Sequence, residues 1–520
     1  MENAAKTVVI PQTEYDEMKE AIVRIAKLEA LVKYYEEQLL LAKRRQFGVS
    51  SERTEIDLLQ MSLFGGSEPA LPPEPELEDI SYKRKKRKDK REEDLSGLPV
   101  ERVDYELPEE ERGCPKCSAP MRDIGVNIRQ EIEIIPAKAV LKEHAVHSYA
   151  CVNTECAETS GGVTIIKAAS PKPLISGSLV SPSLAAHIAV QKYSNGMPLY
   201  RIEKGFQYDG LNISRQNMAN WVIQCAMLYL MAMYLRLIEF LLMESVLHTD
   251  ETTLQVLNEP GRAAQSKSYE WVYRSSGCAK RKIVIYEYKE TRKQEHPREF
   301  LREFKGFLHT DGYQAYHNLP PDIVVVGCWS HARRPWEKLL KLVPEEKRKG
   351  SDAERGLAYI NALFDLERKF KELSPEERYN ERLKKSKPVS DAFFEWIGGL
   401  GALPKSPIGE AVHYAVSQRE YLENVFLDGR LEISNNRCER SVKPFVMGRK
   451  AWLFSSTPEG AHASSVMYSI IETAKENGLH PFHYLKYLLE TLPNTTIGNI
   501  DALLPWSDSL PDSCYAPVKE

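Results

Sequence analysis

A short motif that occurs twice, Leu-His-Thr-Asp, constrains this sequence more than any other feature. The copies, Leu247–Asp250 and Leu308–Asp311, each close an apolar run. Strand side chains alternate between faces, so the His and the Asp of each copy share one face. Hard cations prefer oxygen ligands, and carboxylates at neighbouring strand ends can hold two Mg²⁺ ions about 3.5–4 Å apart. One copy alone would be read as solvated surface, whereas the repeat predicts a two-metal phosphodiester site.

The strands around the two motifs follow the order of a ribonuclease-H-like core. The pattern predicts strands at residues 246–252, 268–273 and 282–288, followed by a helix at 297–304 and a strand at 307–311. A helix around residue 313 and a strand at 323–327 come next. In this order the first and fourth strands are adjacent, which brings Asp250 and Asp311 side by side. We therefore expect a multidomain α/β protein with a ribonuclease-H-like mixed-sheet catalytic core.

A third carboxylate is offered by Glu439, in a stretch where Ser434 or Asn435 could cap a helix. Basic residues surround it, and cations beside a catalytic carboxylate suit a phosphate-backbone substrate. Taken alone, the stretch would be read as a helix with ordinary salt bridges. The basic residues that we expect to bind DNA here are Arg440, Lys443, Arg449 and Lys450.

Cysteines with metal-ligand spacing occur before this core. They form two pairs, C-x2-C and C-x4-C, at Cys114, Cys117, Cys151 and Cys156. Four thiolates suit one tetrahedral Zn²⁺ in a closed, structural site. The x4 spacing is looser than usual, so His144 or His147 could replace one ligand. A separate C-x2-H pair, Cys328 and His331, has no partner pair and is more simply interpreted as a cap on the next helix.

Three short helices are predicted between residues 182 and 223, the first from Pro182 to Tyr193, and the last two could form a helix-turn-helix. Ser214 is a plausible N-cap of the third helix. Its first turn carries polar side chains where a recognition helix reads bases: Arg215, Gln216 and Asn217. The alternative is a plain helical connector.

The N-terminal segments suggest association and tethering. Apolar residues from Met18 to Ala42 follow a heptad spacing, which favours a coiled coil that pairs subunits over a helix packed on its own protein. Residues 65–105 lack periodicity and pass from an acidic, Pro-rich stretch to a basic run at 83–88. That run could contact DNA phosphates or could be a solvated tether.

Composition excludes several classes of protein. A chain of 520 residues with a net charge of −4 has room for three to four domains. Nine cysteines, an odd count, make a disulfide framework unexpected, and the first twenty residues lack the apolar core of a signal peptide. Residues 222–243 are membrane-like, but Gln224, Arg236 and Glu239 interrupt them, so we expect a buried helix of a soluble protein.

The chain resembles the transposases of the insertion sequence 66 family over nearly its whole length. The matching pieces, in chain order, are RRQFGVSSER, the C-x2-C … C-x4-C pattern, YSNGMPLYRIEK, HTDETTLQVL, HTDGYQAY, GCWSHARRPW, NNRCERSVKPFVMGRKAWLF and ALLPW. One departure is the looser second cysteine pair. Long motifs in the same order make this resemblance specific.

The resemblance implies a DDE catalytic triad, which falls on Asp250, Asp311 and Glu439. Two Mg²⁺ ions on these carboxylates would activate water or a DNA 3′-hydroxyl for in-line attack on a phosphodiester. Glu251 should point to the opposite strand face and not be a ligand. The expected partners are double-stranded DNA (the terminal inverted repeats of the element and its target), a second copy of the chain and accessory proteins of the same element. The expected location is the bacterial cytoplasm, with the nucleoid and without a membrane.

These features define a domain order. We expect a coiled-coil helix (1–60), a disordered linker (61–105), a zinc ribbon (106–170) and a helix-turn-helix region (171–240). The first part of the core (241–335), a helical insertion (336–428), the second part of the core (429–490) and a tail (491–520) follow. Two other functions remain open at this stage: a DNA-binding regulator without catalysis, and a nuclease with the same core.

Overall fold

The protein is described here by a computed structural model of residues 139–150, 165–170, 172–495 and 497–517, together with isolated positions between 11 and 24. The chain divides into two compact units, residues 66–171 with 516–520 and residues 1–65 with 172–515. In the first unit, β1 (Ser148–Ala150) pairs antiparallel with β2 (Ile165–Lys167). The four predicted zinc cysteines, the linker and nearly all of the heptad segment lie outside the described residues.

A five-stranded mixed sheet forms the centre of the second unit. Its strands are β3 (Val246–Gln255), β4 (Lys267–Ser275), β5 (Val284–Lys289), β6 (Gly306–His309) and β7 (Ile323–Val326). Their order in space is β5-β4-β3-β6-β7; β4 runs antiparallel to β3 and β5, and β6 runs parallel to β3 and β7. The predicted adjacency of the first and fourth strands is confirmed.

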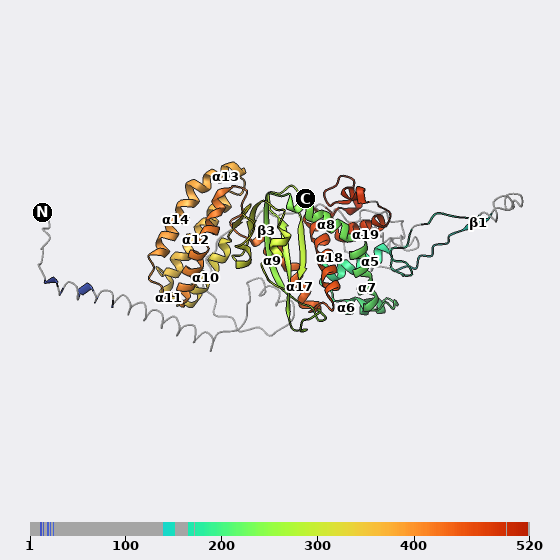
Figure 1. The fold of residues 1–520 in the computed structure, drawn as a ribbon, viewed down its shortest axis with the longest axis horizontal. Helices are drawn as coiled ribbons and strands as arrows, with labels where there is room; N and C mark the ends of the chain where they lie inside the picture. The colour runs from blue at the N-terminus through green and yellow to red at the C-terminus, as the bar shows by residue number, and fades with distance from the viewer. Residues whose placement is uncertain are drawn as a thin grey trace, which may run out of the picture. The chain divides into compact units, whose positions relative to one another are not determined.

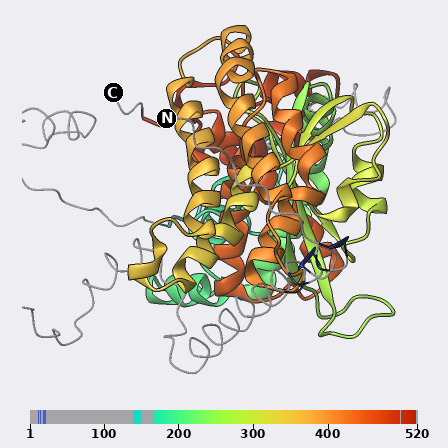
Figure 2. The ribbon, with the colours of Figure 1, turned by 90° about the vertical axis from the view of Figure 1, so that its left-hand side faces the viewer.

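Helices surround this sheet. In chain order they are α5 (Pro182–Tyr193), α6 (Leu199–Tyr208), α7 (Arg215–Cys225), η2 (Ala226–Leu230), α8 (Met231–Leu242), α9 (Glu295–Phe300), η3 (Gln314–Tyr316), α10 (Trp329–Leu342), α11 (Glu345–Arg348), α12 (Asp352–Lys369), α13 (Pro375–Glu381), η4 (Arg382–Ser386), α14 (Lys387–Gly398), α15 (Pro407–Ser417), α16 (Arg419–Glu423), η5 (Asn424–Leu427), α17 (Asn436–Trp452), α18 (Pro458–Glu476), α19 (Pro481–Thr491), η6 (Leu492–Asn494), η7 (Ile497–Leu503) and η8 (Asp512–Cys514). Figure 1 shows the sheet between α8, α18 and α19 on one side and α10, α12 and α14 on the other. Figure 2 views the unit from the side of α10–α14.

Each group of helices has its own hydrophobic core. One core joins α5–α8 and α17–α19 to the sheet, and the other joins α10, α12, α14, α15 and α16 to β3 and β7. Along β3 the two cores alternate, because Val246 belongs to the second and Leu247 to the first. Both faces of the sheet are therefore covered at this end of β3, which explains why the sequence there is continuously apolar.

Helix α18 covers the open edge of the sheet at β5. Thr473 Oγ1 accepts a hydrogen bond from Val284 N and donates one to Val284 O, each at 3.0 Å. Ser469 Oγ accepts from Tyr286 N at 2.8 Å. An uncovered edge strand can pair with strands of other chains. These buried hydroxyls therefore complete the hydrogen bonding of the sheet where a sixth strand would otherwise lie.

The apolar segment predicted as a buried helix forms the larger, C-terminal part of one continuous helix, Arg215–Leu242. An 18-residue window of this helix has a mean hydropathy of 1.7, and among the described residues it is the one helix that is long and apolar enough for a membrane span. Leu237 and Leu241 are nevertheless buried in the core, and the Tyr234 hydroxyl donates to Tyr286 O at 2.9 Å. Arg236 forms an ion pair with Asp501 at 2.7 Å. These contacts are those of a helix packed against a globular core.

Local signals placed some helix ends well and others poorly. Helix α5 has the predicted bounds, and the predicted N-cap Ser214 accepts from Asn217 N at 3.2 Å. The helix predicted at 297–304 instead begins at Glu295 and ends at Phe300, and the helix expected near Tyr313 is a single 3-10 turn, η3. Asn435 stands at the N-cap position of α17 but makes no capping bond, because its side chain bonds to β3.

A buried carboxyl on β5 predicts a pH-dependent stability. Burial raises the pKa of Glu287 to about 7 despite the Lys289 ammonium at 3.1 Å. Because the folded state holds this proton and the unfolded chain releases it near pH 4.5, the group destabilises the fold progressively from about pH 4.5 to about pH 7. Glu287→Gln should therefore gain stability over the wild type as the pH rises, by on the order of 3 kcal/mol at pH 8.

Urea unfolding at pH 5 and pH 8 measures this difference. Glu303→Gln, which changes an exposed glutamate of the same unit, is the matched control and should show no such trend. If the difference in unfolding free energy between Glu287→Gln and the wild type did not change with pH, the raised pKa of Glu287 would be contradicted.

Candidate active site

Two predicted carboxylates meet where β6 ends beside β3. The register pairs His248 with His309, so Asp250 on β3 and Asp311 just past the end of β6 each follow two residues later. Asp250, Glu251 and Asp311 each offer an oxygen atom, and these atoms lie within 4.8 Å of one another. An all-oxygen set of three carboxylates at this spacing fits a hard divalent cation such as Mg²⁺.

Glu251 lies closer to this pair than strand alternation suggested. Its side chain is on the face of Thr249, as expected, since the Tyr316 hydroxyl contacts both residues. Strand β6 stops at His309, however, so no neighbouring strand separates the Glu251 carboxylate from Asp311. Glu251 thus has the expected strand face, yet one of its oxygens lies close to those of Asp250 and Asp311. Its oxygens are engaged by Arg292, whose Nε lies 2.6 Å from Oε1, and by Tyr316.

The carboxylates repel one another in a largely buried setting. Burial and the charges of Glu251 and Asp311 raise the pKa of Asp250 well above its usual range, and Glu439 adds to the effect. Burial also raises the pKa of Glu251, with Asp311 contributing and Tyr316 and Arg292 opposing. Clustered carboxylates with raised pKa values are typical of sites that bind a cation or transfer a proton.

The two histidines of the repeated motif stack beneath the carboxylates. The ring centroids of His248 and His309 lie 4.3 Å apart, and the angle between the ring planes is 10°. His248 Nδ1 lies 3.0 Å from Asn435 Oδ1, and His309 Nε2 accepts from Glu432 N at 3.2 Å. Burial lowers the pKa of His248 to about 3 and that of His309 well below its usual value, so both rings are neutral. They join β3 and β6 to the segment that leads into α17.

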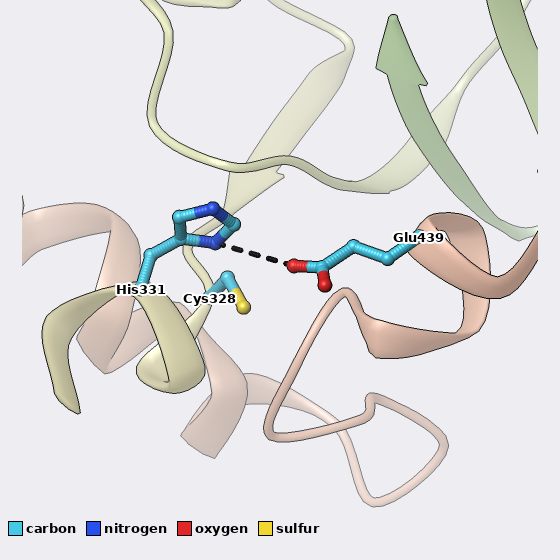
Figure 3. Close-up of side chains that lie close together, drawn as sticks. All are labelled: Cys328, His331 and Glu439. Carbon is cyan, nitrogen blue, oxygen red and sulfur yellow. Dashed lines mark ion pairs between the residues drawn. The ribbon is translucent and has the colours of Figure 1, made fainter. Parts of the chain in front are cut away.

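Glu439 is on the first turn of α17, with its carboxylate held by α10. Arg334 Nη2 donates to both Glu439 oxygens at 2.8 Å, and Arg334 Nη1 lies 2.7 Å from His331 Nε2. Because Nε2 faces a donor, the proton of the neutral ring is on Nδ1, which lies 3.7 Å from Glu439 Oε1. Figure 3 shows His331 and Glu439 facing each other beside Cys328. Asp311 and Glu439 both act on the pKa of His331, which burial lowers overall.

Cys328, His331 and Glu439 also have ligand atoms within 4.8 Å of one another. The thiol is buried, and burial raises its pKa; its sulfur accepts from Asn435 N at 3.1 Å. A protonated thiol in this position is a packing group and a hydrogen-bond acceptor. Cys328 stands at the N-cap position of α10, as predicted, although its side chain makes no capping bond.

The basic residues predicted near Glu439 divide into two groups. Arg440, Lys443 and Lys450 are exposed on α17 at helical spacing, and so share one outer face. Arg449 is turned toward β3, where its guanidinium donates to Thr252 Oγ1 at 3.1 Å. On α7, the predicted base-reading residues Arg215, Gln216 and Asn217 are all exposed in the first turn.

Two cationic depressions adjoin carboxylates of the site, one near Glu251 and the other at Glu439. One, of about 920 Å³, includes Arg292, Lys293 and Arg298 and reaches Glu251 through Arg292. The other, of about 440 Å³, includes Glu439 and four basic residues, Arg333, Arg334, Arg440 and Lys443. Arg292, Arg333 and Arg334 were not among the predicted site residues. The arginine pair that follows the C-x2-H motif after Ala332 was the available signal for two of them.

Four regions of the chain match models of one protein family. The model described as Transposase IS66 family matches residues 177–463, more than half of the chain, and the IS66 C-terminal element matches residues 469–506. A model described as Transposase C of IS166 homeodomain matches residues 34–103, and the zinc-finger binding domain of transposase IS66 matches residues 111–153. The last range includes three of the four predicted zinc cysteines and ends before Cys156.

Similar proteins occur in Sinorhizobium fredii (strain NBRC 101917 / NGR234). The uncharacterized protein y4qI is 32% identical over 363 residues, which cover 66% of this chain and 65% of that protein. The uncharacterized protein y4jD is 28% identical over 422 residues, 78% of this chain and 80% of that protein. The likeness covers most of the chain, and the names of these relatives state no activity.

Proposed function

Since the chain belongs to the IS66 family of transposases, a family of DDE enzymes, we propose that it binds the terminal repeats of its insertion sequence and catalyses metal-dependent DNA cleavage and strand transfer. The observation that carries this proposal is the meeting of Asp250 and Asp311 at the end of β6, with Glu439 near enough to raise the pKa of Asp250. The strand order β5-β4-β3-β6-β7 supports a ribonuclease-H-like core as its scaffold.

In this proposal Asp250, Asp311 and Glu439 hold two Mg²⁺ ions. The chemistry that bound Mg²⁺ supplies at such a site is activation of an attacking oxygen and neutralisation of phosphate charge. Asp250 and Asp311 are fixed by adjacent strands, and Glu439 comes from a helix tied to those strands through His248 and Asn435. The site is thus positioned by rigid elements, which the in-line geometry of phosphoryl transfer requires. No covalent bond between protein and DNA is needed.

Glu251 has a supporting role in this proposal. Both of its oxygens are occupied by Arg292 and Tyr316. A carboxylate held in this way adds negative charge beside Asp250 and Asp311, and it could offer an oxygen to a metal only in competition with Arg292 or Tyr316. It therefore increases the attraction of the site for a divalent cation.

The DNA is proposed to cross the carboxylates between the two cationic depressions. Arg292, Lys293 and Arg298 line one side, and Arg334, Arg440 and Lys443 line the other. Lys450 extends the second group along α17. Cations on both sides of a carboxylate cluster suit a polyanion that must approach otherwise repulsive groups. A regulator that only binds DNA would have no use for the clustered carboxylates.

Incubation with the element's terminal DNA and Mg²⁺ tests the function. We expect cleavage at the element end followed by joining of the free 3′-end to a second duplex. Binding without cleavage would support the regulator, and cleavage without joining would support the nuclease. The zinc ribbon and the heptad segment are proposed to orient the DNA and to pair two subunits, so that two element ends meet in one complex.

Sequence preference and general affinity should be separable. Replacing Arg215, Gln216 and Asn217 with Ala should relax base preference, because each bidentate contact contributes roughly 1–3 kcal/mol of discrimination. Lys443→Gln with Lys450→Gln should instead weaken binding to every sequence and reduce the salt slope by about two. Competition binding between terminal and unrelated duplexes at several salt concentrations measures both. Unchanged preference after the triple replacement would mean that bases are read elsewhere.

A further inference from the structure

One guanidinium closes over the proposed catalytic glutamate. Arg334 Nη2 donates to both oxygens of Glu439, and Nη1 of the same group lies against His331. The Arg334 side chain is 48% exposed and that of Glu439 is 29% exposed. An ion pair this open to water is weak enough to exchange partners. In the arrangement described, however, neither Glu439 oxygen is free for another cation.

The depression beside this pair carries more positive charge than its own acids can neutralise. Its lining residues are Ser330, Arg333, Arg334, Glu337, Asn436, Glu439, Arg440 and Lys443. Glu337 is already paired with Arg333 at 2.7 Å and with Lys341 at 3.0 Å. Among the described residues, Arg440 and Lys443 have no ion-pair partner. Glu439 is therefore the one lining carboxylate left to neutralise the charges of Arg334, Arg440 and Lys443.

Two helix N-termini open into the same depression. Ser330 is the second residue of α10 and Asn436 is the first residue of α17. The positive end of a helix dipole favours an anion, although in α10 the N–H groups of Trp329 and His331 already donate to Ile433 O and Cys328 O. Two helix N-termini and three cations around a depression of about 440 Å³ form a site that suits a tetrahedral oxyanion. A phosphodiester has this shape and charge.

We propose that this depression, the α10–α17 pocket, seats a phosphate of the substrate DNA, and that Arg334 is shared between that phosphate and Glu439. The proposal rests on the catalytic role assigned to Glu439 above. When the phosphate enters, Arg334 turns to it and releases Glu439 for metal binding. Without DNA, Arg334 occupies the carboxylate and its charge repels a second cation. DNA and metal then favour each other's binding, and this coupling is reciprocal.

Metal affinity without DNA gives the first test. The probe is Mn²⁺, measured by electron paramagnetic resonance on the full-length, zinc-loaded chain. Arg334→Gln should raise Mn²⁺ affinity by about fivefold, because it frees Glu439 and removes a positive charge. Lys338→Gln is the matched control: it removes the same charge one turn further along α10, outside the pocket, and should change Mn²⁺ affinity little.

Coupling to DNA gives the second test. The same titration is repeated with a 20-base-pair duplex, corrected for Mn²⁺ bound by the duplex alone. The duplex should raise the Mn²⁺ affinity of the wild type at least about fivefold, and this gain should be lost in Arg334→Gln. That variant should also bind the duplex more weakly, with a salt slope reduced by about one. Arg334→Lys, which keeps the charge, should recover part of the DNA affinity.

The outcomes separate this inference from the proposed function. If the wild type binds no Mn²⁺ at Asp250 and Asp311, the catalytic assignment and the exchange both fail. If the wild type binds Mn²⁺ but Arg334→Gln leaves its affinity unchanged or lowers it, the exchange alone is wrong. An Arg334→Gln variant with wild-type coupling between duplex and Mn²⁺ would overturn it equally.

Discussion

Asp250→Asn should lower DNA cleavage at least about a thousandfold and, at the same time, stabilise the metal-free protein. Activity falls because an amide oxygen is a poor substitute for a carboxylate that holds a divalent cation and offsets its charge. Stability rises because one of three mutually repelling, largely buried charges is removed. The bond from Glu251 N to Asp250 Oδ1, 2.9 Å long, can be kept by an amide. A gain of roughly 1–2 kcal/mol is typical when an active-site charge conflict is relieved.

Cleavage assays and thermal unfolding at pH 8, without metal, measure the two effects. Asp322→Asn, an exposed aspartate paired with Lys305 in the same unit, should change neither. Asp311→Asn and Glu439→Gln should also abolish cleavage. Glu251→Gln should retain more activity than Asp250→Asn, since the Glu251 oxygens are held by Arg292 and Tyr316. Near-wild-type cleavage by Asp250→Asn would place the active site elsewhere, and lost cleavage with lower stability would indicate a folding defect.

Cys117→Ser should release the single structural Zn²⁺ and unfold the zinc ribbon while the catalytic unit stays folded. Structural zinc contributes folding free energy directly, on the order of 10 kcal/mol in small zinc domains. Residues 172–515 contain two hydrophobic cores of their own and do not depend on that free energy. The variant should therefore lose zinc and gain protease-sensitive sites in residues 106–170, while the core fragment persists.

Metal analysis of the reduced protein and limited proteolysis test this. Cys156→Ser addresses the remaining ambiguity, because the matched zinc-finger model ends at residue 153. Loss of zinc in Cys156→Ser would make Cys156 the fourth ligand, whereas retained zinc would favour His144 or His147. A wild-type protein that contains no zinc, or a core that unfolds together with the ribbon, would contradict the prediction.

The sequence was informative where a signal is local or repeats. The adjacency of β3 and β6 followed from the strand order, and the meeting of Asp250 and Asp311 followed from the repeated motif. The capping role of Ser214 and the bounds of α5 were readable because caps and prolines act on their own helix. In each case the determining residues are within a few positions of the element that they define, or occur twice.

Contacts between distant segments were not readable. Arg334 and Glu439 are separated by 105 positions, and no pattern in either segment predicts that the two side chains form an ion pair. Strand alternation gave the face of Glu251 correctly, but its proximity to Asp311 depends on where β6 ends, which periodicity does not fix. Asn435 was expected as a cap and instead bonds to His248 and Thr249 O, because a buried tertiary partner outcompeted the local one.

Because α18 covers β5 and follows it in the sequence, the strand is synthesised before the helix that completes its hydrogen bonding. Val284 and its partner Thr473 are 189 positions apart. At about 5–20 residues per second, β5 leaves the ribosome roughly 10–40 seconds before the helix that completes it. During that interval the strand edge is open, and a nascent chain needs a chaperone or rapid elongation to avoid pairing with its neighbours. A truncated copy that ends before residue 458 would keep this edge permanently, so partial genes should give insoluble fragments rather than soluble competitors of the full-length protein.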